Sequence, residues 1–566
     1  MGPLRGETES PLRTLKPEHP RLILTDAELP RIRSLTKENP LARKIFAELV
    51  KEADRLLAVP PLELKPQTTR IPPPSRRLLE RMYTLALVYR LDGRKVFLDR
   101  AVREMHSAAS TKDWNPAHFP EVAEVTQAMA IGYDWLFPGL VAQERLWIKQ
   151  AIVEKGIDPA IAVYGTSGGA SVGTGVWNLL GNTGMGIGAL AIADEEPEKC
   201  AAVMRGVLES IPRGMSIYNV DGGPQEASGL FHIATEAVAC FVSAMESALG
   251  TDFGISSAKG LEHAGRFRVY ASGPSGKILT GFDNADDPGS APELFWLARR
   301  FAQPVLAWHE ERQVERTARA DALALVWYPK ETKSPQAAAW PLDALFAGAQ
   351  TAIFRSAWDD PAALFLAVKG GDNKNGHAHV DFGSFAFTAG GVNWAIDLGQ
   401  YPRSRTEFHN TILIDDENQD AKAEARLVRH EFLPEISWVQ IDLTKTYPAK
   451  VKSLTRRVGL AQRQTVLIED TLSAAQPVEL LWQMITDADL TFDGQNAELQ
   501  KDGWTLSAEI HTPRHAVFDV VTSAPGIKKL VVRLGEKVSD LDLNVSLTPH
   551  KTGTPKPKTT VKFPAA

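Results

Sequence analysis

Apolar residues recur every three or four positions over the first part of the chain, which predicts a series of helices between residues 27 and 325. In the segment RLLERMYTLALVYRLDG, Leu78, Met82, Leu85 and Tyr89 share one face, and the Asp-Gly pair that follows is a helix stop signal. The segment EVAEVTQAMAIGYDWLF repeats this pattern. Helix pairs in series bury one face against their neighbours, so they form either an open solenoid or a closed ring.

A second pattern begins after residues 328–340, which are polar and interrupted by proline. Short apolar runs rich in β-branched and aromatic residues follow and predict strands at residues 363–368, 384–389, 411–414, 465–470 and 530–534. Gly, Asp and Asn separate the runs, as in an antiparallel sandwich. We therefore predict an α+β multidomain protein, with a helical domain at 1–335 and an antiparallel β-sandwich at 336–566. The end of the chain, rich in Pro, Lys and Thr, is expected to be a loosely held tail.

Composition and charge narrow the range of partners. The 566 residues carry a formal net charge of -6, which argues against a nucleic-acid-binding protein. No apolar run reaches the roughly 20 residues of a membrane helix, so we expect no membrane association.

Cys200 and Cys240 are expected to be buried thiols, with a disulfide as the alternative. Residues 1–16 lack the apolar core of a signal peptide. We expect a periplasmic or secreted protein whose export signal is missing from this sequence, with a cytoplasmic location as the alternative.

Candidate chemistry is concentrated in GDNKNGHAHVDFGSFAFTAGGVNWAIDLGQ and the following EFHNTILIDD. If the first segment is a strand, His377 and His379 lie on one of its faces. Asp397 and His409 follow on neighbouring predicted strands, and a His/Asp/His set supplies three positions of a tetrahedral metal site. Alternatively, these side chains only link strands through hydrogen bonds.

The blocks NGHAHVDFGSF, AIDLG and FHNTILID resemble the signature of the heparinase II/III-like polysaccharide lyases, whose relatives include glycosaminoglycan and alginate lyases. HPRLILTDAELPRI, IGYDWLF, WNLLGNTGMGIGALAIA and ESALGTDFG extend the resemblance into the helical half. It implies an N-terminal incomplete (α/α) toroid followed by a β-sandwich, with the substrate in a cleft between them. It also implies that His379, Asp397 and His409 bind a divalent metal ion, usually zinc, with manganese as an alternative.

The chemistry that the resemblance implies is β-elimination at a uronic acid within an acidic polysaccharide. The enzyme must neutralise the substrate carboxylate, remove the C5 proton and protonate the departing oxygen. By similarity, Asn178 binds the carboxylate, and His377 is the sandwich histidine that acts as base or acid. Relatives carry a toroid tyrosine where this chain has GGPQEASGLFHIATEA. His232 is therefore expected to replace that tyrosine, or Tyr401 to act as the general acid.

Six further residues are candidates for substrate binding: Asn182, Gln225, Glu226, Arg403, Arg405 and Tyr164. The two arginines suit carboxylates or sulfates because a guanidinium matches both groups, although a solvated loop is an equal alternative. Asn182 is a reserve for Asn178, and packing is its alternative role. Tyr164 begins the loop YGTSGGASVGTG, which lacks the ending of a phosphate-binding loop.

Two other function classes remain open. Helical toroids also carry the paired carboxylates of glycoside hydrolases, for which Asp221, Glu226 and Glu236 are candidates, although the motif is rich in histidine instead. A carbohydrate-binding protein without catalysis is the third class, because the toroid tyrosine is missing. Glycosaminoglycan is the first expected substrate and alginate the second, and the sequence does not indicate an oligomeric state.

Overall fold

The computed structural model describes residues 9–64, 73–166, 173–224, 228–277, 289–318, 321–372, 379–398, 404–560 and 562–564. The chain divides into two compact units. The helical unit comprises Met1–Asn219, Gly229–Ala264 and Gly289–Lys333, and the β unit comprises Val220–Ser228, Gly265–Pro288 and Ser334–Ala566. The predicted boundary at 335/336 lies close to this division, but two segments from the helical half join the β unit.

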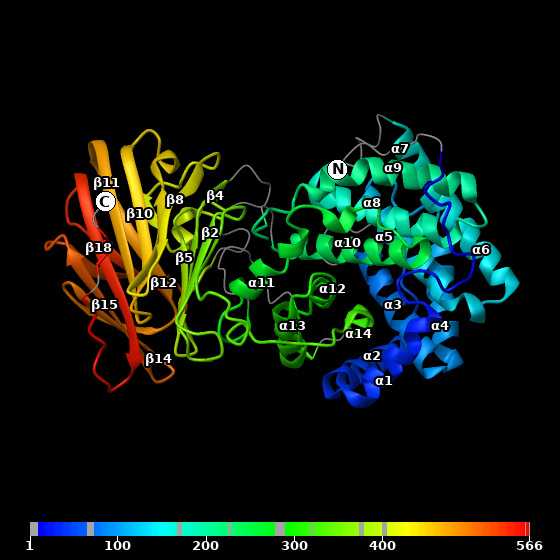
Figure 1. The fold of residues 1–566 in the computed structure, drawn as a ribbon. Helices are drawn as coiled ribbons and strands as arrows, with labels where there is room; N and C mark the ends of the chain where they lie inside the picture. Colours follow the sequence, from blue (N-terminus) through cyan, green and yellow to red (C-terminus); the bar gives the residue numbers. More distant parts are fainter. Residues whose placement is uncertain are drawn as a thin grey trace. The chain divides into compact units, whose positions relative to one another are not determined.

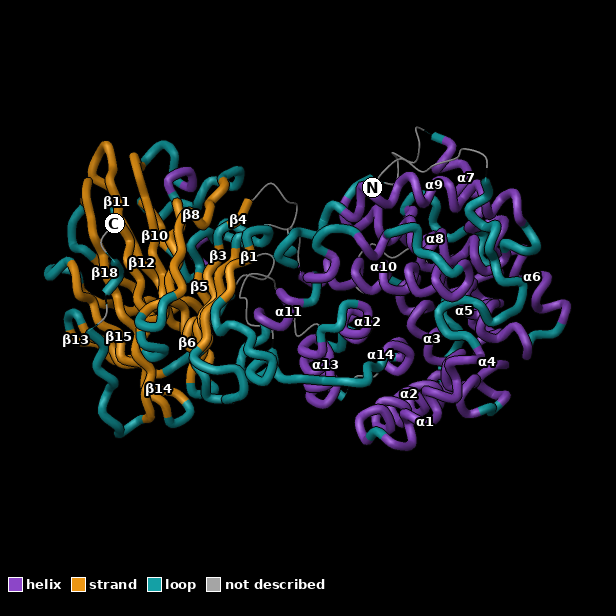
Figure 2. The backbone as a smooth tube through the Cα atoms, viewed as in Figure 1, coloured by secondary structure: helices purple, strands orange, loops and turns teal. Residues whose placement is uncertain are grey.

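The helical unit is built of helices in series (Figures 1 and 2). Their bounds are α1 Leu29–Glu38, α2 Pro40–Ala58, α3 Pro74–Asp92, α4 Lys95–Ala109, α5 Phe119–Leu136, α6 Ala142–Ile152, α7 Asp158–Gly165, α8 Gly175–Ile192, α9 Pro197–Met215, α10 Ser228–Leu249, α12 Glu293–Arg300, α13 Pro304–Thr317 and α14 Ala322–Trp327. The predicted helical series is confirmed. The Asp-Gly stop signal is also confirmed, since Gly93 ends α3 in the left-handed conformation and its N–H donates to Tyr89 O at 2.8 Å.

Four helices, α3, α5, α8 and α10, run parallel to one another. In each neighbouring pair, residues later in one helix contact residues later in the other, which shows that the two helices run in the same direction. The contacts are Ser75–Glu124 and Met82–Gly132 between α3 and α5, and Ala123–Gly184 and Thr126–Gly188 between α5 and α8. Between α3 and α10 they are Arg76–Glu236 and Tyr83–Cys240. Helices α5 and α8 are buried almost all round, whereas α4 and α9 bury residues at spacings of three or four. Parallel inner helices with half-exposed partners are the arrangement of an (α/α) toroid.

The inner helices approach one another closely at glycines of α8. A Cβ at Gly184 would lie 2.4 Å from the carbonyl oxygen of Ala123, and one at Gly186 would lie 2.3 Å from the ring of Phe241 in α10. Glycine permits this separation because it has no side chain. The parallel direction and these contacts bring the N-terminal ends of α8 and α10 to the same end of the bundle.

The described residues of the β unit form three sheets, and every strand pair in them is antiparallel. Their orders are β1-β2-β3-β5-β6, β13-β14-β15-β18-β11-β10-β9-β8-β4 and β16-β17-β12-β7. The bounds are β1 Ala344–Phe346, β2 Thr351–Arg355, β3 Phe365–Lys369, β4 Gly371–Asp372, β5 Phe385–Ala389, β6 Val392–Ala395, β7 Ile412–Ile414, β8 Glu424–Phe432, β9 Ile436–Asp442, β10 Val451–Ala461, β11 Thr465–Val478, β12 Leu480–Thr486, β13 Asp489–Asp493, β14 Asn496–Lys501, β15 Trp504–Thr512, β16 Val517–Ala524, β17 Ile527–Arg533 and β18 Val538–Lys551.

Both faces of the five-stranded sheet are buried. Leu366 and Val368 of β3 face the large core that all three sheets share. Phe365 and Ala367 face the opposite way and pack against α11 (Arg266–Ala271), which Figure 2 shows beside this sheet. This alternation follows from the two-residue period of a strand. It also explains why the run ALFLAV is apolar throughout rather than alternating.

All five predicted strands are confirmed, as β3, β5, β7, β11 and β17. The expectation of a loosely held tail is wrong in part. Strand β18 extends to Lys551, and Phe563 packs against Trp438 with a ring separation of 6.1 Å. Arg457 also donates to Pro564 O at 2.7 Å, so the end of the chain is fixed to the sandwich.

Cys200 and Cys240 are buried free thiols, as expected. Among the described residues, one helical stretch, Gly229–Leu249, has the length and apolar composition of a membrane span. More than half of the residues in the most apolar part of this stretch are buried inside the protein, which is typical of a core helix.

Candidate active site and metal centre

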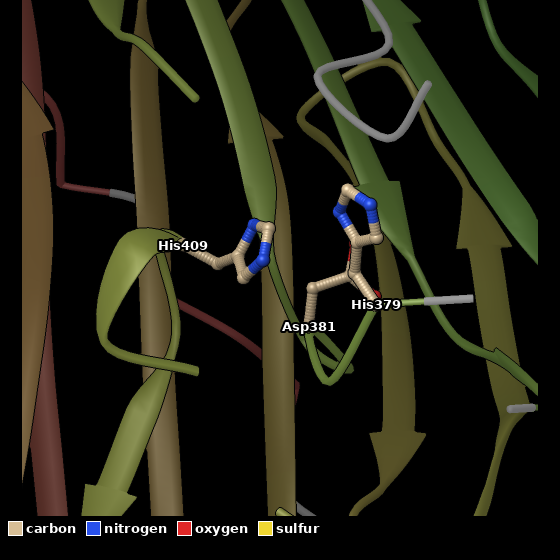
Figure 3. A group of neighbouring side chains, drawn as sticks. All are labelled: His379, Asp381 and His409. Carbon is tan, nitrogen blue, oxygen red and sulfur yellow. The ribbon is translucent and has the colours of Figure 1, made fainter. Parts of the chain in front are cut away.

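Three side chains of the β unit form a compact group of potential metal ligands. Ligand atoms of His379, Asp381 and His409 all lie within 4.8 Å of one another (Figure 3). The ring centroids of His379 and His409 are 5.4 Å apart. Asp381 and His409 are fully buried. Each residue comes from a connecting segment: His379 and Asp381 precede β5, and His409 precedes β7.

Two atoms of this group lack a hydrogen-bond partner among the described residues. Asp381 accepts a hydrogen bond from Lys369 Nζ at 2.7 Å through Oδ2, but its buried Oδ1 has no partner. His409 Nε2 is likewise buried without a partner. An unsatisfied buried polar atom costs about 1–3 kcal/mol. These two atoms, beside the imidazole of His379, fit a divalent cation that takes nitrogen and carboxylate ligands.

Asp397 occupies a different position from the predicted one. Its Oδ2 lies 3.0 Å from His409 Nδ1, the ring nitrogen on the other side from the unpartnered Nε2. A carboxylate that accepts from one nitrogen of a metal-binding histidine orients the other nitrogen toward the metal. Among the described residues, Asp381 therefore lies in the cluster, whereas Asp397 accepts from the opposite nitrogen of His409, and its role as a metal ligand stays a prediction.

The two histidines have opposite electrostatic surroundings. Burial would lower the pKa of His409, but the hydrogen bond and charge of Asp397, with the charge of Asp381, outweigh it and raise that pKa. Burial lowers the pKa of His379 despite the nearby Asp381, and His409 and Lys369 lower it further. A low pKa keeps His379 neutral, which is the form that binds metal.

Several predicted site residues of the β unit lie outside the described residues: His377, Tyr401 and Arg403. His379 is described, but it lies in a loop, so the expected strand that would align it with His377 is wrong at this position. Arg405 is exposed, and its Nε lies 3.2 Å from Glu407. It is accessible to an anionic ligand, in competition with Glu407.

In the helical unit, Asn178 and Asn182 are fully buried. Asn178 Nδ2 donates to Gly173 O at 2.8 Å and to Ser210 Oγ at 3.1 Å, while Asn182 Nδ2 donates to Asn178 Oδ1 at 2.8 Å. Tyr164 is also buried, and its hydroxyl donates to Asn182 Oδ1 at 2.8 Å. The hydrogen bonds of Asn182 and Tyr164 stay within the unit and support Asn178, so their contact with substrate stays a prediction. Both hydrogens of Asn178 Nδ2 are already donated, so a ligand that accepts from Asn178 must displace Gly173 O or Ser210 Oγ.

His232 lies in the first turns of α10, at the same end of the inner helices as Asn178 in α8. Gly186 and Phe241 lie side by side, and from them Asn178 and His232 are each about 12–14 Å back along a parallel helix. His232 Nδ1 is hydrogen-bonded to Glu293 Oε1. Gln225 and Glu226, which precede α10, lie outside the described residues.

Sequence reasoning missed Asp381 and Glu293. Asp381 carried a usable signal, because it is two residues from His379 within the same histidine-rich segment. Glu293 had none, since 61 residues separate it from His232 and only the folded unit brings the two together.

Comparisons with known proteins agree with this architecture. Residues 342–556 match the family described as heparinase II/III-like, C-terminal. A heparan sulfate lyase from Pedobacter heparinus is 16% identical, with a TM-score of 0.63 over 95% of this chain and 93% of that one. A solved heparinase III is 14% identical, with a TM-score of 0.61 over 93% of this chain and 93% of that one. A chondroitin AC lyase variant from Streptomyces coelicolor A3 is 13% identical, with a TM-score of 0.56 over 92% of this chain and 82% of that one. No curated protein matches the chain. Residues 342–556 are therefore similar to the heparinase II/III-like C-terminal family, and the chain has the fold of these solved lyases, a helical toroid and an antiparallel β-sandwich.

Proposed function

We propose that this protein is a polysaccharide lyase that cleaves a uronate-containing polymer by β-elimination and leaves an unsaturated uronate at the new end. The observation that carries the proposal is the presence of Asn178 and His232 at one end of the parallel inner helices, in a chain with the fold of such lyases. An amide and an imidazole supply a carboxylate-binding group and a proton-transfer group. Glycosaminoglycans such as hyaluronan, chondroitin sulfate and heparan sulfate are the first proposed substrates, and alginate is the second.

The remaining roles are proposed from sequence resemblance. His377 and Tyr401 are candidates for the residue that returns a proton to the leaving oxygen, and Arg403 and Arg405 for binding of carboxylates or sulfates. In this reaction the bond between C5 and hydrogen breaks, its electrons form the C4–C5 double bond, and the bond from C4 to the glycosidic oxygen breaks. A base must take the C5 proton and an acid must supply one to the oxygen.

We also propose that the β unit binds a divalent metal ion, zinc first and manganese second, through His379, Asp381 and His409. When bound, such an ion supplies positive charge beside Asp381 and links the segments that precede β5 and β7. Its role is structural in this proposal, since its ligands lie on two segments far apart in the sequence and an ion that binds only the folded unit stabilises it.

A glycoside hydrolase is the competing class, and the structure supplies little for it. Asp221 accepts hydrogen bonds from the amides of Gly223 at 2.8 Å and Gly348 at 3.1 Å, as a turn residue does. Glu236 is paired with Arg76 at 2.6 Å. Two of the three candidate carboxylates are therefore engaged, and the third, Glu226, lies outside the described residues.

The test is to incubate the protein with hyaluronan, chondroitin sulfate, heparan sulfate, heparin and alginate separately. Ultraviolet absorbance of the conjugated uronate and reducing ends are then followed together. We expect both signals to rise in parallel on at least one polymer. Reducing ends without the absorbance would replace the lyase with a hydrolase, and saccharide binding with neither signal would identify a binding protein.

A further inference from the structure

His232 and Glu293 form a buried pair within the helical unit. His232 Nδ1 is within hydrogen-bonding distance of Glu293 Oε1, and the side chains are 12% and 3% exposed. His232 belongs to α10, and Glu293 is the first residue of α12. The two helices are far apart in sequence, so the pairing depends on the folded arrangement.

The position of Glu293 is fixed from two sides. A carboxylate in the first turn of a helix is stabilised by the partial positive charge there. The segment that leads into α12 is held by Glu310 of α13, which is fully buried and accepts from Ser290 Oγ and Ala291 N, both at 2.6 Å. A buried carboxylate is costly unless it is paired. The imidazole of His232 is the partner that the fold places against it.

This pairing determines which nitrogen of His232 can take part in chemistry. When a carboxylate accepts from Nδ1–H, it fixes the tautomer and orientation of the ring, and proton exchange with a substrate then runs through Nε2. The same arrangement stabilises the imidazolium that forms after proton uptake.

Three described tyrosines that contact α8 or α10 are poor substitutes for the missing toroid tyrosine. Tyr218 donates to Thr235 at 3.3 Å, Tyr83 lies against Cys240, and Tyr164 donates to Asn182. Burial raises the pKa of all three phenols. A buried phenol that already donates its proton within the protein is not prepared to accept one from a sugar.

We propose that Glu293 is the positioning residue of a His232–Glu293 dyad, in which the carboxylate holds Nδ1–H and Nε2 removes the C5 proton of the uronate. This proposal rests on the proposed lyase function. In the step, Nε2 gains the proton, the electrons of the broken bond form the C4–C5 double bond, and the glycosidic oxygen leaves with a proton from the general acid. Glu293 does not touch the substrate and acts only through His232.

The experiment compares Glu293→Ala, Glu293→Asp and the control Glu104→Gln in the full-length protein. Glu104 is a fully buried carboxylate of α4 that is paired with Arg100 and Arg81, so its replacement reports the purely structural effect of losing a buried carboxylate. Nitrogen-15 NMR of the histidine rings gives the tautomer of His232, assigned by loss of its signals in His232→Gln. Steady-state kinetics on the best substrate gives kcat and KM separately.

We expect the wild type to show the Nδ1–H tautomer and Glu293→Ala to shift His232 toward the Nε2–H tautomer. Glu293→Ala should lower kcat by about 10²-fold or more with KM nearly unchanged, and Glu293→Asp should recover part of the rate. Glu104→Gln should keep the wild-type tautomer and kcat.

An unchanged tautomer and rate in Glu293→Ala would overturn the dyad, as would equal losses in Glu104→Gln. A tautomer shift in a protein with no lyase activity on any polymer would leave the dyad in place and remove its role as base. Failure of the proposed function is thereby separated from failure of the pairing.

Discussion

Binding of a metal ion should raise the unfolding free energy of the β unit, because it gives a partner to the two unpartnered atoms of the cluster. Leaving Asp381 Oδ1 and His409 Nε2 unsatisfied costs about 2–6 kcal/mol together, at about 1–3 kcal/mol each. An ion that binds only the folded state and is present at 100 times its Kd adds about 2.7 kcal/mol of stability. For a unit of this size, that corresponds to a rise in Tm of about 5–11 °C.

The assay is differential scanning calorimetry of the full chain after treatment with a chelator and again after addition of zinc or manganese. Metal content is measured in parallel by mass spectrometry. His409→Ala and Asp381→Asn should abolish both stoichiometric binding and the rise in Tm. Asp397→Asn should bind about 10–100-fold more weakly, because it removes only the group that orients His409. The control His430→Ala changes an exposed histidine of β8 and should leave both readouts intact.

Identical Tm values with and without metal, and no bound ion, would refute the reasoning. Loss of binding in Asp397→Asn with retention in Asp381→Asn would instead restore the ligand set expected from the sequence.

Three further predictions concern other parts of the chain. Burial and the charge of Glu236 raise the pKa of Asp321 to about 7. The folded state therefore binds more protons than the unfolded state between about pH 4 and 7, and stability falls as pH rises through that range. Asp321→Asn, which keeps a capping side chain for α14, should raise the Tm at about pH 8 but not at about pH 4, and equal shifts would contradict this origin. Arg456 and Asp470 are fully buried and joined by hydrogen bonds of 2.7 and 2.9 Å, so Arg456→Met should lower the unfolding free energy in urea by about 3–5 kcal/mol. A loss below about 1 kcal/mol would show that the pair is dispensable. His377→Ala should abolish turnover with an unchanged Tm, and near-normal kcat would remove His377 from the reaction.

Local patterns in the sequence predicted the elements well, because each rests on interactions close along the chain. The apolar face of α3 and its end at Gly93 follow from helical periodicity and from the left-handed conformation that glycine tolerates. Strand β3 was recognisable from its composition and flanking turns. In each case the signal lies within a few residues of the element itself.

The candidate site was harder to predict, since its geometry depends on contacts between distant segments. The close packing of α8 buries Asn178 and Asn182 on every side, and no local pattern indicates such depth. The resemblance points to Asp397, and only the fold shows that Asp381 also lies beside His379 and His409. The pairing of Glu293 with His232 likewise required the position of α12.

The most direct test of the central claim is cleavage in ¹⁸O-labelled water, with products analysed by mass spectrometry and ultraviolet absorbance. β-Elimination adds no water across the glycosidic bond. We therefore predict products that carry the absorbing unsaturated uronate at one end and no ¹⁸O incorporated by the cleavage step. Saturated products with ¹⁸O at the new reducing end would contradict the account and identify a hydrolase.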